Sequence, residues 1–173
     1  MFNLAMVWQL NYYKGISRFA KYALNGWQIL PIVKLRSGLP LTIANGVDAN
    51  LDGNNTDRAE LIGNPHLAHA SAAKWFNTAA FAENLIVNGH PVDGNSGRNI
   101  LDAPGLRDVD LALAWIFQLS ERVNLQFRCE GSNAFNIVSL GTPGTTVSAP
   151  STFGIIRSAQ PMRQLQFGLR LLF

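Results

Sequence analysis

The last ten residues of the chain, QLQFGLRLLF from Gln164 to Phe173, decide its fold. Every second side chain in this stretch is apolar, and the side chains between them are mostly polar. The apolar positions are Leu165, Phe167, Leu169, Leu171 and Phe173. A period of two places these side chains on one face of a β-strand. The stretch therefore predicts a strand with an apolar face that continues to its final residue.

The same alternation occurs in four other stretches, which cover residues 2–12, 27–41, 109–119 and 123–130. Most of them are longer than the usual strand of about five to six residues. At ~3.3 Å per residue, a strand of about eleven residues is roughly 36 Å long. Tilted by ~45°, such a strand crosses the ~25 Å apolar band of an outer membrane. Strand length thus favours membrane-spanning strands.

The connections between these stretches alternate in length. Ser120–Arg122 is a tight turn, and Lys14–Gly26 is a short linker in which Ser17 caps a brief helix through Leu24 and Gly26 ends it. The other two connections, 43–106 and 137–161, are long and rich in Gly, Asn, Pro, Ser and Thr. Short turns on one side and long loops on the other are typical of transmembrane barrels.

The chain direction implied by these connections brings four aromatic residues to the short-turn side. They are Tyr12, Trp27, Phe117 and Phe173. Aromatic residues gathered at one level of a barrel form an interfacial girdle. We therefore predict an all-β fold, an antiparallel up-and-down meander of about five long strands with two long loops. Residues 1–173 are expected to form a single partial domain, an incomplete piece of a transmembrane β-barrel.

The composition agrees with this prediction and excludes several other classes of protein. Only 14% of the residues are charged, compared with about 25% in soluble domains. The net charge is +3 and the basic residues are scattered, so no nucleic-acid surface is expected. The chain has no apolar stretch of about 18 residues and no signal-peptide pattern at its start. The only cysteine, Cys129, excludes an internal disulfide.

A set of motifs in a fixed order resembles the C-terminal barrel of TonB-dependent outer-membrane receptors, and most closely their Oar-like subgroup. The motifs are GWQI (26–29), SGLPLTI (37–43), WFNTAAF (75–81), GRNIL (97–101), PG (104–105), DVDLAL (108–113), ERVNLQFRCE (121–130) and MRQLQFGLRLLF (162–173). The resemblance covers roughly residues 26–173. One departure is Ser132, which stands where the family usually has an aromatic residue in an EAFN-type segment.

This resemblance implies a segment of an outer-membrane transporter and not an enzyme. The segment would supply wall strands and extracellular loops to energy-coupled uptake of an unknown ligand. Its implied partners are outer-membrane lipid, further N-terminal strands and a plug domain outside this chain, and an inner-membrane energy-coupling protein. The terminal Phe173, with Leu171 and Leu169, resembles the end signal that the barrel assembly machinery recognises. No cofactor is implied.

A candidate metal site lies in DANLDGNNTD, residues 48–57. Asp48, Asn50 and Asp52 have the spacing of oxygen ligands in a calcium loop, and Gly53 stands at its sharp turn. The twelfth position of such a loop needs a bidentate Glu, and here it is Ala59. A weak Ca²⁺ site is one interpretation, and a turn-rich loop without a metal is the other.

Other polar residues of the long loop are better explained as ordinary loop residues than as catalytic or metal-binding ones. His66, His69 and His90 lack the framework of a zinc site, so we expect solvated loop histidines. Ser96 lies in GNSGR, which does not match the G-x-S-x-G nucleophile elbow. A tight loop is the expected role of this segment.

Charged residues in the strands fall on the faces opposite the apolar ones, which predicts a wet lumen. They are Lys34, Arg36, Asp108, Asp110, Arg128, Glu130 and Arg170. Cys129 falls on the apolar face, where it would act as a small hydrophobic residue. The alternative function is a soluble β-sandwich binding module that uses its long loops for recognition; it would have shorter strands and a closed core.

Overall fold

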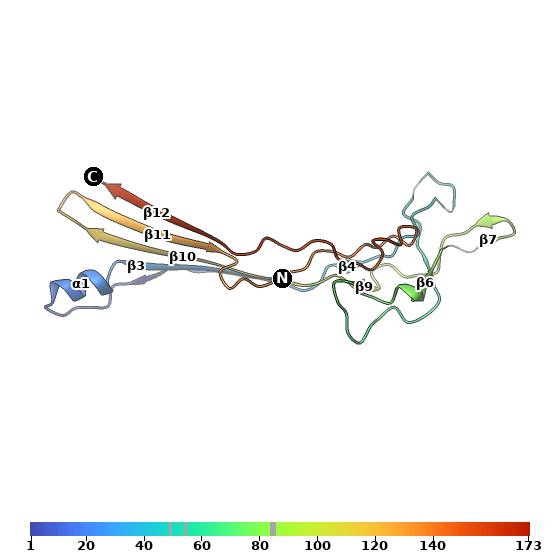
Figure 1. Cartoon of the computed structure of the whole chain (residues 1–173), viewed down its shortest axis with the longest axis horizontal. Coiled ribbons are helices and arrows are strands. Elements are labelled where there is room, and N and C mark those ends of the chain that lie inside the picture. The colour runs from blue at the N-terminus through green and yellow to red at the C-terminus, as the bar shows by residue number, and fades with distance from the viewer. Residues whose placement is uncertain (49, 54, 84–85) are drawn as a thin grey trace. The chain divides into compact units, whose positions relative to one another are not determined.

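The computed structural model describes residues 1–48, 50–53, 55–83 and 86–173. The chain divides into two compact units (Figure 1). The sheet unit comprises residues 1–36, 106–138 and 161–173, and the loop unit comprises residues 37–105 and 139–160. No helix in the described part of the chain is long and apolar enough to span a membrane.

The sheet unit is one antiparallel sheet. Its strands are β1 (Phe2–Ala5), β2 (Trp8–Leu10), β3 (Trp27–Arg36), β10 (Leu106–Gln118), β11 (Asn124–Ser132) and β12 (Gln164–Leu172). The order is β1-β3-β10-β11-β12, and β2 also pairs with β3. Neighbours in the sheet therefore follow the order of the five alternating stretches in the sequence. The predicted all-β, up-and-down meander of an incomplete barrel is confirmed.

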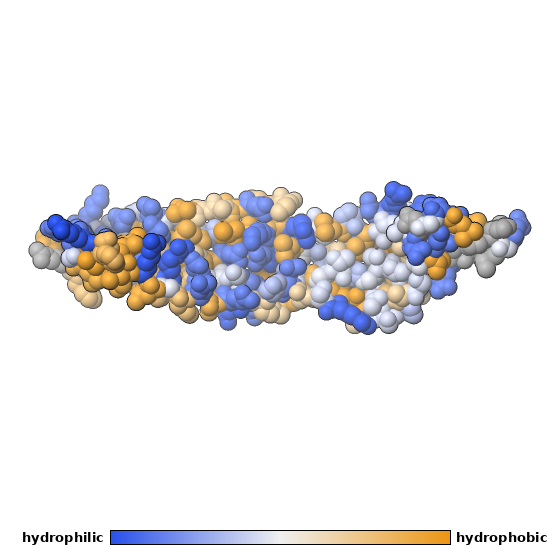
Figure 2. Space-filling model, turned by 90° about the horizontal axis from the view of Figure 1, so that it is seen from above, coloured by the Kyte–Doolittle hydropathy of each residue, from blue (hydrophilic) through white to orange (hydrophobic). Residues whose placement is uncertain are grey.

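The strand register brings the alternating apolar side chains of neighbouring strands onto one face of the sheet. Leu113 lies opposite Ile29 on β3 and opposite Cys129 on β11, and Cys129 lies opposite Phe167 on β12. Because directly opposed residues of an antiparallel pair share a face, the apolar face runs across four strands without a break. Figure 2 shows apolar residues exposed over the part of the surface that the sheet unit forms (left).

The first predicted strand is interrupted, and Pro31 explains the interruption. Phe2 pairs with Leu35 and Trp8 with Ile29, so β1 and β2 keep one register along β3. In that register Met6 lies opposite Pro31, and Met6 N donates to Pro31 O over 3.2 Å. The reciprocal bond is absent because proline has no backbone N–H. The ladder is therefore weakest where β1 ends and β2 begins.

The second predicted strand is shorter than expected. We expected it to reach Leu41, but β3 ends at Arg36, and Pro40–Leu41 form β4, which pairs with β9 (Leu101–Asp102) in the loop unit. At Gly38 an added Cβ would lie 1.9 Å from Ala103 O. Only glycine permits such a close approach of two backbones, so Gly38 allows the segment after β3 to pair with residues 101–103.

Both short connections form as predicted. Helix α1 spans Arg18–Leu24, and Ser17 caps it by accepting a hydrogen bond from Ala20 N over 3.3 Å. Gly26 follows the helix with a φ of +81°, a conformation that favours glycine. The turn between β10 and β11 is closed by Leu119 N donating to Val123 O over 2.9 Å.

The two long connections fold together into the loop unit, which the sequence reasoning did not foresee. Its short elements are β4, β9, β5 (Glu60–Leu61), β6 (Phe81–Ala82), β7 (Ile86–Val87), β8 (His90–Pro91) and the 3₁₀ helix Thr78–Ala80. The core of the unit consists of Leu41, Ile43, Ala59, Phe76, Ala80, Phe81, Leu101, Ala103 and Phe153. Burial of these apolar side chains stabilises an ordered structure in the two long connections.

Candidate functional site

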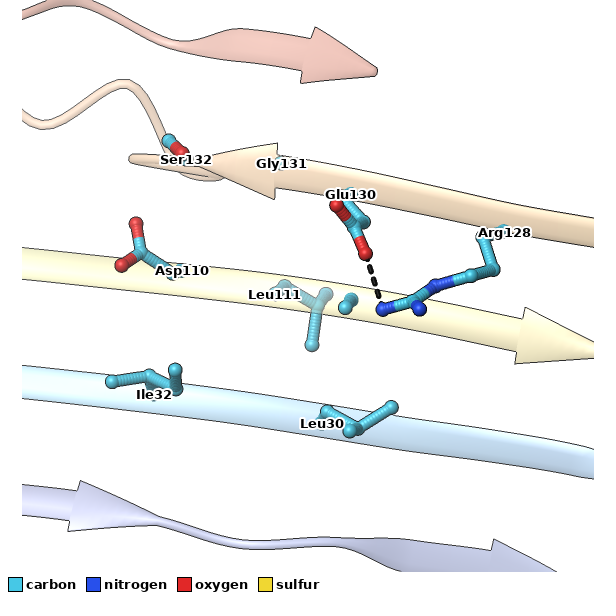
Figure 3. A pocket seen from close by; sticks show the side chains of 9 residues that line it. Leu30, Ile32, Asp110, Leu111, Arg128, Glu130, Gly131 and Ser132 are labelled. Atoms are coloured by element: carbon cyan, nitrogen blue, oxygen red, sulfur yellow. Dashed lines mark ion pairs between the residues drawn. The ribbon is translucent and has the colours of Figure 1, made fainter. Parts of the chain in front are cut away.

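Ion pairs gather on the polar face of the sheet unit, as the sequence predicts. Lys34 Nζ lies 3.2 Å from Asp108 Oδ2 and 2.9 Å from Asp110 Oδ2. Lys34 is directly opposite Asp108 in the register, so the strands themselves bring these charges together. On β11, Arg128 forms an ion pair with Glu130 (Figure 3). Arg170 lies on the same face, because its register partner is Gln126.

A shallow depression of about 290 Å³ lies between these charges on the polar face. Its lining residues are Leu30, Ile32, Asp110, Leu111, Ala112, Arg128, Glu130, Gly131 and Ser132. Figure 3 shows the side chains of Leu30 and Ile32 on the strand beside β10, with the Arg128–Glu130 pair on its other side. The polar face thus carries both apolar and charged side chains. In the depression, Leu30 and Ile32 lie beside the charged residues Asp110, Arg128 and Glu130.

Asn133 connects the end of β11 to this charge cluster, and the sequence reasoning missed it. Its backbone N donates to Asp110 Oδ1 over 3.0 Å, and its Nδ2 donates to Ile137 O over 2.9 Å. Asn133 has a φ of +47°, which Asn tolerates better than most residues. An Asn directly after a strand was the sequence signal that could have predicted this role. The hydrogen bonds of Asn133 hold the backbone in place just after Ser132.

Aromatic side chains cluster at the end of the sheet unit where the short turns lie. Trp27 stacks on Trp115 with ring centres 5.6 Å apart and an angle of 17°. Phe117 contacts Trp115 at 5.5 Å and Tyr22 at 5.1 Å. Trp27 and Phe117 thus lie where the girdle was predicted, and Tyr12 accepts a hydrogen bond from the Trp8 indole. Trp115 and Tyr22 are additional members that the prediction did not include.

The apolar face of the sheet is uncovered along β12. Phe167 is 66% exposed and Leu169 is 70% exposed, and Leu165, Leu171 and Phe173 are also exposed. Exposed apolar patches of this extent indicate contact with lipid or with another protein. In the described residues no second layer packs on this strand, so the closed core that a sandwich requires is absent there.

The loop unit brings together three of the sequence motifs that carry the resemblance. Phe76 and Phe81 of WFNTAAF pack edge-to-face with each other and with Phe153, at ring distances of 5.2–6.0 Å. Thr42 of SGLPLTI accepts a hydrogen bond from the backbone N of Asn99 in GRNIL over 3.1 Å. Leu41 and Ile43 of SGLPLTI and Leu101 of GRNIL join these rings, so residues far apart in sequence share one core.

A second set of contacts fixes the segment DGNS (93–96) against residues 58–61. Arg58 Nη2 lies 2.9 Å from Asp93 Oδ2, and Arg58 Nη1 donates to Ser96 O over 3.1 Å. The hydrogen bond from Arg58 holds the pKa of Asp93 below its ordinary value. Asn95 Nδ2 donates to Glu60 Oε1 over 2.7 Å. The sequence reasoning missed these pairs because their partners are more than thirty positions apart.

The candidate calcium loop is held by hydrogen bonds from its backbone N–H groups to its own Asp and Asn side chains. Asp48 accepts from Asp52 N and from Gly53 N, and Asn50 Oδ1 accepts from Asp52 N. Asp57 Oδ2 accepts from Asn50 N over 3.1 Å. Across the described ranges, no three His, Cys, Asp or Glu side chains are grouped as metal ligands; Ala49 and Asn54 of this loop lie outside those ranges.

The weak Ca²⁺ site at Asp48, Asn50 and Asp52 therefore stays a prediction. Calorimetric titration of the full chain with Ca²⁺ up to about 1 mM, the range of weak extracellular sites, tests it. Absence of heat would contradict the site.

The remaining candidates take separate positions. His66 lines a depression of about 200 Å³ in the loop unit together with Trp75 and Asp102. His69 is exposed, and the side chain of His90 lies outside the described residues. Ser96 is completely buried, and its hydroxyl has no hydrogen-bond partner among the residues that the structure describes. The structure does not group His66, His69 and Ser96 into one site.

A comparison with known protein families supplies the identity of the fold. Residues 1–166 match the family described as an outer membrane beta barrel domain. No curated protein and no solved structure matches the chain. The matched range covers nearly the whole chain, so the chain belongs to this family, and its place is the outer membrane.

Proposed function

We propose that this member of the outer membrane beta barrel domain family is part of a TonB-dependent receptor of the Oar-like subgroup. In this proposal the sheet unit forms a section of the barrel wall, with its apolar face toward lipid. The loop unit supplies extracellular surface for binding a ligand. Energy for uptake comes from an inner-membrane coupling protein, which acts through a plug domain outside this chain.

The observation that carries the proposal is the ordered set of receptor-like motifs and the contacts they make. WFNTAAF, SGLPLTI and GRNIL contribute Phe76, Thr42 and Asn99 to one folded loop unit. DVDLAL and ERVNLQFRCE pair as neighbouring strands, with Leu113 opposite Cys129. A long ordered loop unit supports a receptor better than a simple pore, because recognition needs a defined surface.

The polar face of the sheet supports a water-filled interior. Lys34 is paired there with Asp108 and Asp110, and Arg128 is paired with Glu130. On the lipid side, a Lys or Arg near the midplane would cost about 2–4 kcal/mol. The alternative of a soluble β-sandwich does not hold, because the chain belongs to an outer-membrane barrel family.

The test compares two bacterial deletion strains, one without the gene of this chain and one without the inner-membrane energy-coupling protein. Accumulation of a panel of radiolabelled nutrients is measured in both strains and in the parent. We expect the same nutrient to fail to accumulate in both deletion strains. A nutrient lost only from the first strain would overturn energy-coupled uptake and leave a passive barrel.

A further inference from the structure

The linker between β2 and β3, residues 14–24, lies against the apolar face of the sheet. Trp115 Nε1 donates to Tyr22 O and to Asn25 O, each over 3.2 Å. Trp27 Nε1 donates to Ala23 O over 2.9 Å. The side chains of Trp27 and Trp115 stack on the apolar face, so α1 lies on the lipid side of the wall, at the short-turn end (Figure 1).

The outer surface of this linker is apolar and uncovered. Ile16 is 102% exposed, Phe19 is 84% exposed and Leu24 is 58% exposed. The Tyr22 ring, in contrast, packs edge-to-face on Phe117. Tyr22 therefore contacts the sheet, while the large apolar side chains beside it are left uncovered by the described residues.

The same linker is basic. Lys14 and Lys21 are exposed, and no acidic residue occurs between positions 14 and 24. At about 100° per residue, Lys21 lies roughly 200° around the helix from Phe19. The lysine and the phenylalanine thus project from opposite sides, which is the pattern of a helix at a membrane surface.

We propose that residues 14–24 form an interfacial anchor that binds the anionic phospholipid surface at the short-turn side of the barrel. Ile16 and Phe19 insert among the acyl chains, and Lys14 and Lys21 contact the anionic headgroups. The proposal rests on the outer-membrane location of the chain and is independent of what the receptor transports.

Two arguments select lipid as the partner. The linker continues the lipid-facing surface, because it is bonded to the tryptophans of that surface. A helix of seven residues is about 10 Å long and cannot span a hydrocarbon core of about 30 Å. It therefore lies in the plane of the interface, where a basic, apolar segment gains from both burial and charge.

The experiment measures the depth of single nitroxide labels in the full chain reconstituted into lipid vesicles. The chain has one cysteine, so C129A provides the background for F19C and K21C, and A79C in the exposed part of the loop unit is the aqueous control. Vesicles contain phosphatidylcholine alone or with phosphatidylglycerol. Accessibility of each label to oxygen and to a water-soluble nickel chelate gives its depth, and circular dichroism first verifies the β-sheet of each variant.

We expect the label at position 19 to favour oxygen, and the labels at positions 21 and 79 to favour nickel. Neutralising one lysine, K14Q or K21Q in the F19C background, should shift the ratio of inserted to water-exposed label about fivefold in phosphatidylglycerol vesicles. A label at 19 that favours nickel as strongly as the label at 79 would overturn the anchor. Equal insertion at 19 with and without phosphatidylglycerol would overturn the role of the lysines.

Discussion

Leu169 lies directly opposite Phe127 across the ladder of β11 and β12, and both side chains are on the apolar face. Gln166, three residues earlier, lies opposite Glu130 on the polar face. Leu169 and Gln166 are therefore two positions of the same strand whose side chains lie on opposite faces of the sheet.

We predict that L169R reduces the amount of assembled barrel and that Q166R does not. An arginine at the predicted lipid-facing position costs up to about 2–4 kcal/mol depending on its depth in the membrane, whereas the polar face hydrates it. Heat-modifiable mobility of the two variants in outer-membrane fractions measures assembly. Equal assembly of both would contradict the assigned facing.

The Pro31 interruption leads to a prediction on local stability. In P31V a backbone N–H becomes available to Met6 O, and one hydrogen bond contributes about 0.5–1.5 kcal/mol. We expect β1 and β2 to merge and their amides to exchange more slowly with solvent, by roughly a factor of two to ten. Hydrogen exchange of residues 2–10 measures this change, with the β11 amides as internal reference. Unchanged exchange would mean that proline does not limit the ladder.

The loop unit is expected to depend on its buried phenylalanines. Phe76 is 1% exposed and contacts two other rings, so F76A should destabilise the unit by about 3–5 kcal/mol. The exposed control I62A should change stability by less than about 0.5 kcal/mol. Limited proteolysis of reconstituted protein checks this, because cleavage within 37–105 should accelerate only in F76A. Similar cleavage of both variants would show that the core does not hold the loops.

The pair of Arg58 and Asp93 predicts a response to acid. Since Arg58 lowers the pKa of folded Asp93 below its ordinary 3.8, the pair stabilises the folded state fully above that pH. The contribution is lost as the pH falls from 3.8 through the folded-state pKa. We expect the resistance of the loop unit to denaturant to decline as the pH falls below 3.8. D93N and R58Q should each remove the part of this decline that comes from protonation of Asp93. An identical pH profile in both variants and the parent would refute the assignment.

The end of the chain yields a prediction on assembly. Phe173 is 98% exposed, so its side chain contributes little to packing within the sheet unit. We expect F173S to slow barrel assembly in cells while leaving the folded sheet intact, as the resemblance to an assembly signal implies. Pulse-chase labelling of the outer-membrane form measures the rate, with Q166S as control. The same rate in both variants would rule out the signal.

The alternating stretches were enough to predict the sheet. Leu165, Phe167 and Leu169 define a face by their spacing alone, and the register later placed them beside Phe127 and Cys129. The predicted Ser17 cap formed for the same reason, since it depends on a residue three positions away. Interactions that repeat along a strand or form within one helical turn depend on residues close in sequence, so they can be predicted from it.

The fold of the loop unit could not be predicted in this way, because it depends on contacts between residues far apart in sequence. Its phenylalanines come from positions 76, 81 and 153, and the Arg58–Asp93 pair joins two separate segments. No period connects such positions, and composition alone indicated only long, turn-rich loops. The predicted end of β3 was wrong for a related reason, because the residues after Gly38 pair with the segment around Ala103, which is far away in sequence.

The sequence by itself determined the class of this protein, because a two-residue period sorts apolar from polar side chains in any strand, whatever its partners. It also predicted that the apolar face meets lipid. The tertiary structure alone decided what the connections do. It folded the long loops around shared aromatic rings, and it placed residues 14–24 over Trp27 and Trp115. Those outcomes depend on contacts between distant residues, whose cost in chain entropy is offset only when the whole unit packs.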